Sequence, residues 1–367
     1  MSVLPLTPLV HSLPATVPFI GPETQERQRG APFVARIGAN ESVFGPSPAA
    51  VAAMAAAAAE AWRYGDPENN DLKTALATKH GVRPENIVVG EGIDCLLGYL
   101  VRMTVTEGTP VVTSAGAYPT FNYHVAGFGG RLVLSPYKDD REDPDALLGG
   151  ARASGAPLIY FANPDNPMGG WHDAGTMQAM IEAVPEGSIL CLDEAYIEFA
   201  PDQTAPPIDV ANPRVVRLRT FSKAYGMAGA RVGYAIAHAD LALAFNKVRN
   251  HFGVNRIAQA GALAALGDDA WLESVKTRVA AARERIGAIA RANGLKALPS
   301  AANFVAIDCG RDSDYARRLL ARIVAAGVFI RMAFVAPQDR CIRITAGTDA
   351  DLDRFAEALE TALRAVG

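Results

Sequence analysis

The feature that most constrains this chain is a regular alternation of short apolar segments with helical ones between residues 87 and 237. Most of the apolar segments are unbroken and rich in β-branched residues, as in strands that are buried on both faces of a parallel sheet. The predicted strands are IVVG at 87–90, PVVTS at 110–114, RLVLSP at 131–136, LIYFA at 158–162, ILCLDEA at 189–195, RVVRLRTFS at 214–222 and RVGYAIA at 231–237. Between them, helices are predicted at 93–106, 120–128, 144–153 and 177–183. The alternation therefore predicts an α/β fold whose mainly parallel central sheet is flanked by helices.

The regions on either side of this alternation predict a second, smaller unit. An extended N-terminal arm precedes helices expected at 48–62 and 70–80. Beyond Ala239 the pattern changes to long helices, with the longest at 271–293, and then to a shorter α+β segment. The elements of that segment are expected at 304–308, 315–326, 328–332, 341–347 and 349–365. We therefore expect a large domain over residues 41–250, and a small domain formed by the arm 1–40 together with residues 251–367.

Composition places the chain among globular proteins and argues against a nucleic-acid partner. Half of the residues are hydrophobic and 20% are charged, whereas disordered chains combine low hydrophobicity with high net charge. The formal net charge is −4, and nucleic-acid binding relies on concentrated lysine and arginine. The apolar N-terminus contains several prolines and lacks a basic segment, so neither a signal peptide nor a membrane helix is expected.

Cysteine usage predicts a cytoplasmic protein without a metal site. No two cysteines are spaced C-x-x-C, which excludes zinc-ribbon and thioredoxin-like motifs. Most of them lie within apolar runs, where a free cysteine behaves as a small hydrophobic residue. The cysteines expected to be reduced are Cys95, Cys191, Cys309 and Cys341.

The densest chemical signal is the segment TFSKAYGMAGARVGY at 220–234, where a strand ends in a hydroxyl, a lysine and several glycines. Glycines allow a backbone to approach a ligand closely. Ser222 and Arg231 offer a hydroxyl and a guanidinium, which together suit a phosphate dianion. Lys223 lies between them and is either a third phosphate contact or an amine that forms an imine. Taken alone, a single lysine in a glycine-rich segment is more typical of a flexible, solvated basic loop.

Two further strand ends carry polar residues. Asp193 closes an apolar strand and is followed by Glu194, Ala195 and Tyr196, and a buried carboxylate there needs a cation or a strong donor. The turn at 163–169, NPDNPMG, closes another strand. Singly, these are a strand-end acid and a turn. Together with 220–234 they predict one site that contains a lysine, an acid, an amide and a phosphate clamp.

The order of ANPDNPMG, LDEAY, SKAYGMAGARVGY and CIRITAG resembles the fold type I pyridoxal-phosphate aminotransferases, whose fold is aspartate-aminotransferase-like. Within them the chain is most similar to the histidinol-phosphate aminotransferases, over nearly its whole length. ANE at 39–41, RYGDP at 63–67, AYPTF at 117–121 and VFIRM at 328–332 extend the similarity. The resemblance implies pyridoxal 5′-phosphate as cofactor and amino transfer between histidinol phosphate, or a related imidazole or aromatic substrate, and 2-oxoglutarate. It also implies a role in histidine biosynthesis and a homodimer with shared active sites.

Carried over by position, the resemblance implies catalytic roles for Lys223, Asp193 and Tyr196. Lys223 would form the internal aldimine and later move the proton between Cα and C4′. Asp193 would pair with the pyridine nitrogen, because an anion there favours the ring proton that makes the cofactor a better electron sink. Asn166 and Tyr196 resemble the partners of the ring 3′ oxygen, and Tyr118 resembles the aromatic residue that stacks on the ring.

The resemblance also implies a set of anion contacts. Ser222, Arg231 and the backbone amides near Gly92, Ile93 and Asp94 would bind the cofactor phosphate, the last three at a predicted helix N-terminus. Tyr64 would reach that phosphate from a neighbouring subunit. The residues that would contact the substrate are Arg343 on its carboxylate, Arg331 on its phosphate, and Asn40. Three of the residues carried over from the resemblance also have a purely structural interpretation. Tyr118 is then a core aromatic residue, Tyr64 a surface residue and Asn40 a turn residue.

Departures from the family pattern concern the substrate and leave the cofactor chemistry intact. Phe19 stands where the family has a tyrosine, which removes one phosphate donor. The segment 249–255 lacks the usual proline-aromatic pattern, and we expect His251 within it to be a surface residue. Met168 replaces a common threonine in the Asn-Pro turn.

The alternatives are an aminotransferase for another amino acid and a phosphothreonine-type decarboxylase, which shares the lysine, the acid and the arginines. A cofactor-binding regulator on this fold is disfavoured, because the sequence has neither a spare segment nor a basic patch for DNA.

Overall fold

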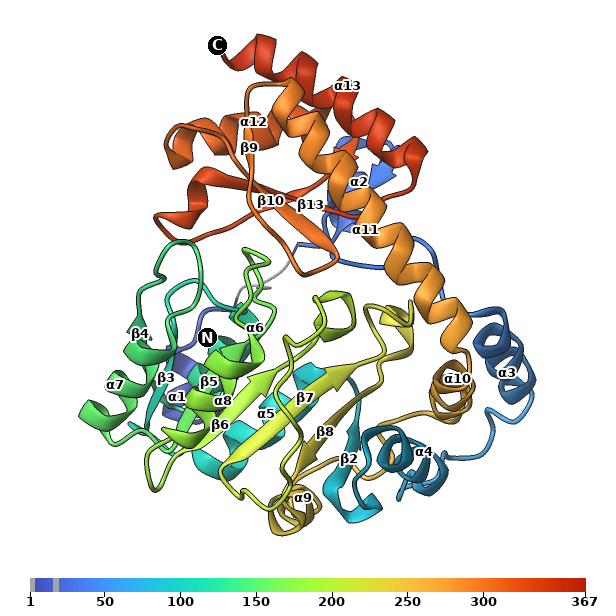
Figure 1. Cartoon of the computed structure of the whole chain (residues 1–367), viewed down its shortest axis with the longest axis vertical. Helices are drawn as coiled ribbons and strands as arrows, with labels where there is room; N and C mark the ends of the chain where they lie inside the picture. The colour runs from blue at the N-terminus through green and yellow to red at the C-terminus, as the bar shows by residue number, and fades with distance from the viewer. Residues whose placement is uncertain (1–3, 16–19) are drawn as a thin grey trace.

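The computed structural model describes residues 4–15 and 20–367 (Figure 1). Its largest sheet has seven strands, and β8 is antiparallel to both of its neighbours while the other neighbouring pairs are parallel. In spatial order the strands are β2 (Ile87–Gly90), β8 (Gly233–Ala237), β7 (Val215–Thr220), β6 (Ile189–Asp193), β5 (Leu158–Ala162), β3 (Pro110–Ser114) and β4 (Arg131–Ser135). The predicted α/β fold with a mainly parallel central sheet is confirmed.

Helices cover both faces of this sheet. On one face, α5 (Ile93–Thr104), α6 (Pro119–Gly127) and α9 (Ala239–Phe245) pack on a buried apolar cluster. On the other face, α7 (Pro144–Ser154) and α8 (Ala174–Glu182) pack on a second cluster. The strands of the parallel part contribute alternate residues to the two clusters, which explains why their sequences are nearly continuously apolar.

Three further helices flank the side of the sheet that carries β2. They are α3 (Pro48–Ala58), α4 (Asn70–His80) and α10 (Arg256–Leu266). The first of these is shorter than predicted, because it ends at Ala58 and leaves Trp62 beyond the helix and 79% exposed.

A second unit is built on a four-stranded antiparallel sheet above the first (Figure 1). Its strands lie in the order β12 (Arg331–Met332), β13 (Cys341–Thr345), β10 (Phe304–Asp308) and β9 (Lys296–Ala297). The helices packed on it are α11 (Asp269–Ala292), α12 (Ser313–Ala325) and α13 (Asp349–Val366).

The single strand predicted at 328–332 was wrong. The structure divides it at Ile330 into β11 (Val328–Phe329), which pairs in parallel with β1 (Ala35–Arg36), and β12, which pairs with β13. The division sends the two halves of one apolar run into different sheets, and it places Arg331 directly opposite Arg343.

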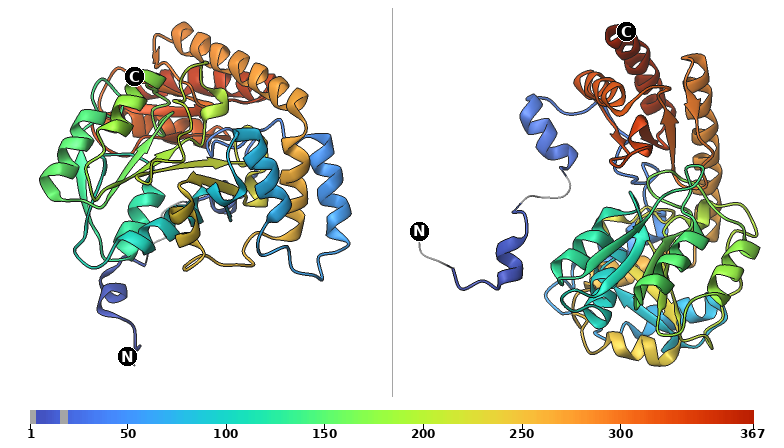
Figure 2. Two further views of the ribbon diagram at one scale, coloured as in Figure 1. Left: turned by 60° about the horizontal axis from the view of Figure 1, so that its bottom comes forward. Right: turned by 90° about the vertical axis from the view of Figure 1, so that its left-hand side faces the viewer.

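The expectation of an extended N-terminal arm was also wrong, because the arm contains α1 (Pro8–Ser12) and α2 (Pro22–Arg29). Each helix begins with its proline, a position where the missing N–H costs nothing. Figure 2 shows, in its right-hand view, that α1 and α2 lie at the edge of the molecule.

The remaining sequence predictions concern the cysteines and the membrane. All four cysteines are free, as predicted; Cys191, Cys309 and Cys341 are buried, whereas Cys95 is only half-buried. Within residues 4–15 and 20–367, no helix is both long and apolar enough to span a membrane.

Candidate active site

A cavity of about 320 Å³ opens at the carboxyl ends of β5, β6 and β7, facing the smaller sheet. This is the edge at which ligands bind in parallel α/β sheets. Twelve of the fourteen predicted site residues line it: Asn40, Ile93, Asp94, Tyr118, Asn166, Asp193, Tyr196, Ser222, Lys223, Arg231, Arg331 and Arg343. The other two are Gly92, which lies against the Arg231 guanidinium directly before Ile93, and Tyr64, which lies elsewhere.

Lys223 follows β7 and projects into the cavity. Its Nζ donates to the backbone oxygen of Asn40 at 3.2 Å and lies 5.7 Å from the centre of the Tyr196 ring. Removal from water and, to a smaller extent, the positive charge of Arg343 together lower the pKa of Lys223 to about 8. Since an amine must lose its proton to act as a nucleophile or a base, Lys223 is more ready for either role than an ordinary lysine.

Asp193 closes β6, and its side chain is buried. Its Oδ2 accepts from the Tyr160 hydroxyl at 2.8 Å and its Oδ1 from the Ala195 amide at 2.9 Å. Burial raises the pKa of Asp193 to about 6, while these two donors hold it down. The strong donor that the sequence required for this acid is therefore an uncharged tyrosine.

Tyr160 was not predicted as a site residue. It lies in β5 opposite Cys191, and Ala162 lies opposite Asp193, so Tyr160 and Asp193 share one face of the sheet. An apolar run gives no indication that one of its members faces a strand-end acid. Only the register between the two strands could have revealed it.

Asn40 connects several of the predicted residues. Its backbone has a positive φ of 56°, its Nδ2 donates to the Tyr196 hydroxyl at 2.9 Å, and its Oδ1 accepts from Thr345 at 3.2 Å. Its backbone oxygen accepts from Lys223 and from Asn303. Asn303 and Thr345, which were not predicted, thus hold the loop that contacts the lysine.

A phosphate-sized group of donors lies at one end of the cavity. Gly92 caps α5 with a φ of 86°, and a Cβ at this position would lie 2.6 Å from Nη2 of Arg231. Nη1 of Arg231 donates to Ser222 Oγ at 3.3 Å, and the Thr220 hydroxyl donates to the same oxygen at 3.0 Å. A helix N-terminus, a guanidinium and a serine together match a phosphate group, so these residues fit a phosphorylated cofactor.

Asp94 lies in the first turn of α5 at this end of the cavity. Its carboxylate accepts from the Tyr118 hydroxyl at 2.8 Å and from Nη2 of Arg231 at 3.3 Å. It therefore fixes the ring of Tyr118 at the cavity wall and orients Arg231.

Two arginines form the opposite end of the cavity. Arg331 and Arg343 face one another across β12 and β13. Arg343 donates from Nη1 to Asn166 Oδ1 at 2.5 Å and Arg331 from Nη2 to the Ile20 oxygen at 3.1 Å. Burial and, to a smaller extent, the charge of Arg331 together lower the pKa of Arg343 to about 10. Two guanidinium groups in one wall create a strong preference for an anion.

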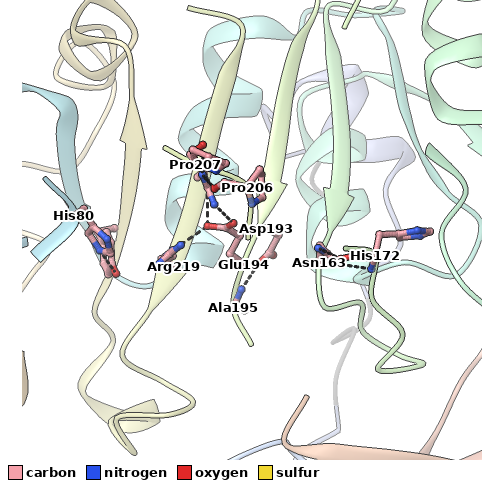
Figure 3. A network of polar contacts seen from close by, with 11 residues as sticks. His80, Asn163, His172, Asp193, Glu194, Ala195, Pro206, Pro207 and Arg219 are labelled. Carbon is pink, nitrogen blue, oxygen red and sulfur yellow. Dashed lines mark hydrogen bonds and ion pairs between the residues drawn. The ribbon is translucent and has the colours of Figure 1, made fainter. Parts of the chain in front are cut away.

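A buried ion network lies on the other side of the Asp193 backbone, and Figure 3 shows Glu194 at its centre. Arg217 donates from Nε and Nη2 to both Glu194 oxygens, and Arg219 donates from Nε at 2.9 Å. Because Asp193 and Glu194 are successive residues, the clamp on Glu194 also fixes the strand end that presents Asp193.

Several predicted residues lie outside this cavity. Tyr64 is 77% exposed, and the centres of its ring and the Phe252 ring are 4.8 Å apart. Within one chain, Tyr64 is therefore a surface residue. His251 is exposed, as expected. Met168 is buried, and its amide donates to Asp165 at 3.1 Å. Phe19 lies outside the described residues.

Comparisons with known proteins agree with this geometry. Residues 34–359 match the family described as aminotransferase class I and II. The chain is 36% identical to a histidinol-phosphate aminotransferase of Anaeromyxobacter sp., over 97% of this chain and 98% of that protein. It is 32% identical to one from Moorella thermoacetica, over 93% of this chain and 88% of that protein.

Solved structures extend the comparison. The crystal structure of histidinol-phosphate aminotransferase from Sinorhizobium meliloti in complex with pyridoxal-5′-phosphate has a TM-score of 0.97 and 53% identity. It covers 100% of this chain and 99% of that chain. A Thermus thermophilus aspartate aminotransferase mutant has a TM-score of 0.82 at 21% identity, over 98% of this chain and 100% of that chain, which shows a shared fold.

Proposed function

The chain belongs to the class I and II aminotransferases and uses pyridoxal phosphate, and we propose that it transfers the amino group of histidinol phosphate to 2-oxoglutarate. The observation that carries this proposal is the pair Arg331 and Arg343, which face one another in the cavity wall. A phosphate dianion needs more positive charge than a single carboxylate does. The similarity to proteins named histidinol-phosphate aminotransferases supports the same substrate.

Lys223 is assigned two tasks: covalent attachment of the cofactor and proton transfer at the substrate. When bound, the cofactor supplies an electron sink that makes the substrate Cα proton acidic. Nζ of Lys223 takes that proton and returns one. Its pKa of about 8 favours this exchange, because the amine gains and loses a proton near neutral pH.

The other predicted residues are assigned to holding the cofactor. Asp193 is assigned to the ring nitrogen, and Asn166 and Tyr196 to the ring 3′ oxygen. Tyr118 covers the ring face, with its hydroxyl held by Asp94. The phosphate contacts are assigned to Ser222, Arg231 and the amides at the start of α5, namely Gly92, Ile93 and Asp94.

At the substrate end, Arg343 and Arg331 bind the phosphate of the donor in one half-reaction and a carboxylate of the acceptor in the other. Asn40 lies between this end and Lys223, and it is assigned to orienting Tyr196 and the lysine. Burial raises the pKa of Tyr196 to about 12, so its hydroxyl keeps its proton.

We also propose a homodimer with shared active sites. Tyr64 and Trp62 are 77% and 79% exposed on the same short segment, and Phe252 beside them is 52% exposed. Covering these rings with a second copy would bury a substantial apolar area. Tyr64 would then reach the cofactor phosphate of the neighbouring subunit.

The test is an amino-donor panel scored by kcat/KM with 2-oxoglutarate, including histidinol phosphate, histidine and aromatic amino acids. We expect histidinol phosphate to be the best donor. A higher value for an unphosphorylated amino acid would overturn the substrate assignment. A protein that never takes the amino group of glutamate would instead favour the decarboxylase alternative.

A further inference from the structure

Tyr160 and Asp193 form a contact at the bottom of the cavity that no sequence motif indicates. Tyr160 is fully buried, and its ring stacks on Phe121 with centroids 4.5 Å apart and planes inclined by 17°. Its hydroxyl lies 2.8 Å from Oδ2 of Asp193. The stack holds the ring, so the hydroxyl is directed at one carboxylate oxygen.

The surroundings of Asp193 disfavour its ionised form, so the Tyr160 hydroxyl is needed to stabilise the negative charge. Burial, together with the negative charges of Asp94 on α5 and of the neighbouring Glu194, raises the pKa of Asp193 to about 6. Cys191 and Tyr196 also interact electrostatically with this carboxylate, and Lys223 lines the same cavity. In the part of the chain that the structure describes, Asp193 forms no ion pair. Its negative charge therefore depends on two donors, the Tyr160 hydroxyl and the Ala195 amide.

We propose that Tyr160 is a positioning residue for Asp193, keeping this carboxylate ionised and directed into the cavity. The inference rests on the proposed function, in which Asp193 serves the ring nitrogen of the cofactor. The Ala195 amide fixes Oδ1, and the Tyr160 hydroxyl fixes Oδ2. With both oxygens held, the carboxylate has one orientation and is ionised at neutral pH.

The chain itself supplies a matched control. Tyr137 donates from its hydroxyl to Oδ1 of Asp165, also at 2.8 Å, and Asp165 is likewise a buried carboxyl with a pKa of about 6. Tyr137→Phe and Tyr160→Phe therefore remove the same kind of contact at the same distance. The loss of a tyrosine hydroxyl as such affects both variants, whereas an effect on Asp193 is expected only at position 160.

The experiment is a pH titration of the Asp193 carboxyl by ¹³C NMR in the full-length protein after removal of the cofactor, with the signal assigned by Asp193→Asn. We expect a midpoint near 6 in the wild type. In Tyr160→Phe the midpoint rises to about 7 or above, because a hydrogen bond to a charged group is lost. In Tyr137→Phe the midpoint of the Asp193 titration stays near its wild-type value. An unchanged midpoint in Tyr160→Phe would overturn the proposal.

The loaded enzyme gives a second readout. In Tyr160→Phe we expect kcat to fall more at pH 6 than at pH 8, because the lost donor makes the Asp193 carboxyl harder to ionise and its ionised fraction recovers as the pH rises. KM for the donor should be unchanged, since the Tyr160 hydroxyl is hydrogen-bonded to Asp193 and is not assigned to the substrate. A loss that is the same at all pH values would mean that Tyr160 has only a structural role.

A variant that keeps the hydroxyl covers the case in which Tyr160→Phe does not fold. With 3-fluorotyrosine in place of Tyr160, the ¹⁹F signal should titrate with the Asp193 midpoint and lose this titration in the Asp193→Asn background. A fluorine signal that does not follow Asp193 would overturn the proposal. Neither titration involves a substrate, so the failure of histidinol phosphate as donor would leave this result standing.

Discussion

The two ends of the cavity are built in different ways. The phosphate end comes from one sheet, with Ser222 and Arg231 beside β7 and β8 and the amides of α5 directly after β2. The arginine end combines three distant parts of the chain, the loop at Asn40, the turn at Asn166 and the smaller sheet with Arg343. We infer that the first end determines which cofactor is held and the second determines which donor is accepted.

This division predicts that substitutions of residues assigned to the cofactor lower the activity with all donors alike. In Lys223→Ala we expect kcat to fall by about a thousandfold or more with every donor, because both the attachment point and the proton carrier are lost. The visible absorbance of the protein-bound cofactor should disappear as well. A variant that retains this absorbance would remove Lys223 from its assigned role.

Changes at the arginine end should instead discriminate between donors. In Arg331→Ala we expect kcat/KM to fall about 10- to 100-fold for histidinol phosphate and only a few-fold for an aromatic amino acid, since a charge-assisted contact to phosphate is lost. Parallel kinetics with both donors measure the difference. Equal losses would contradict the proposed contact and the division between the two ends.

A smaller effect is expected from Gly92→Ala at the phosphate end. The added Cβ would lie 2.6 Å from Nη2 of Arg231, and the φ of 86° is unfavourable for alanine. We expect the cofactor to bind about tenfold more weakly, with the donor preference unchanged once the protein is saturated. Equilibrium titration with pyridoxal phosphate measures the affinity. A changed donor preference would contradict the inference that the phosphate end serves the cofactor and not the donor.

The smallest expected effect concerns stability without cofactor. Lys223 has a folded pKa of about 8, below its unfolded value, so its charge destabilises the fold at pH 7 and this cost disappears as the pH rises to about 10.5. Lys223→Met should therefore raise the free energy of unfolding by about 1–2 kcal/mol at pH 7. Urea unfolding at pH 7 and pH 10 measures it. A gain of equal size at both pH values would point to packing rather than charge.

Sequence reasoning succeeded where the signal is local. The strands at 87–90, 110–114, 158–162 and 304–308 have the predicted bounds. Lys223, Asp193 and Arg231 were expected to share a site because glycines and polar residues mark the ends of apolar strands, and the three residues line one cavity. It failed at residues 328–332, where one apolar run serves two sheets. It also failed for the arm, whose prolines start helices instead of preventing them.

The sequence by itself determined the alternating fold, the order of the strand-end motifs and the chemistry that they offer, because periodicity and turn residues act over a few positions. Only the tertiary structure decided which groups meet. Tyr160 reaches Asp193 through the register of β5 and β6, and Arg331 faces Arg343 through that of β12 and β13. Register and sheet placement depend on packing across the whole core, which no short segment encodes.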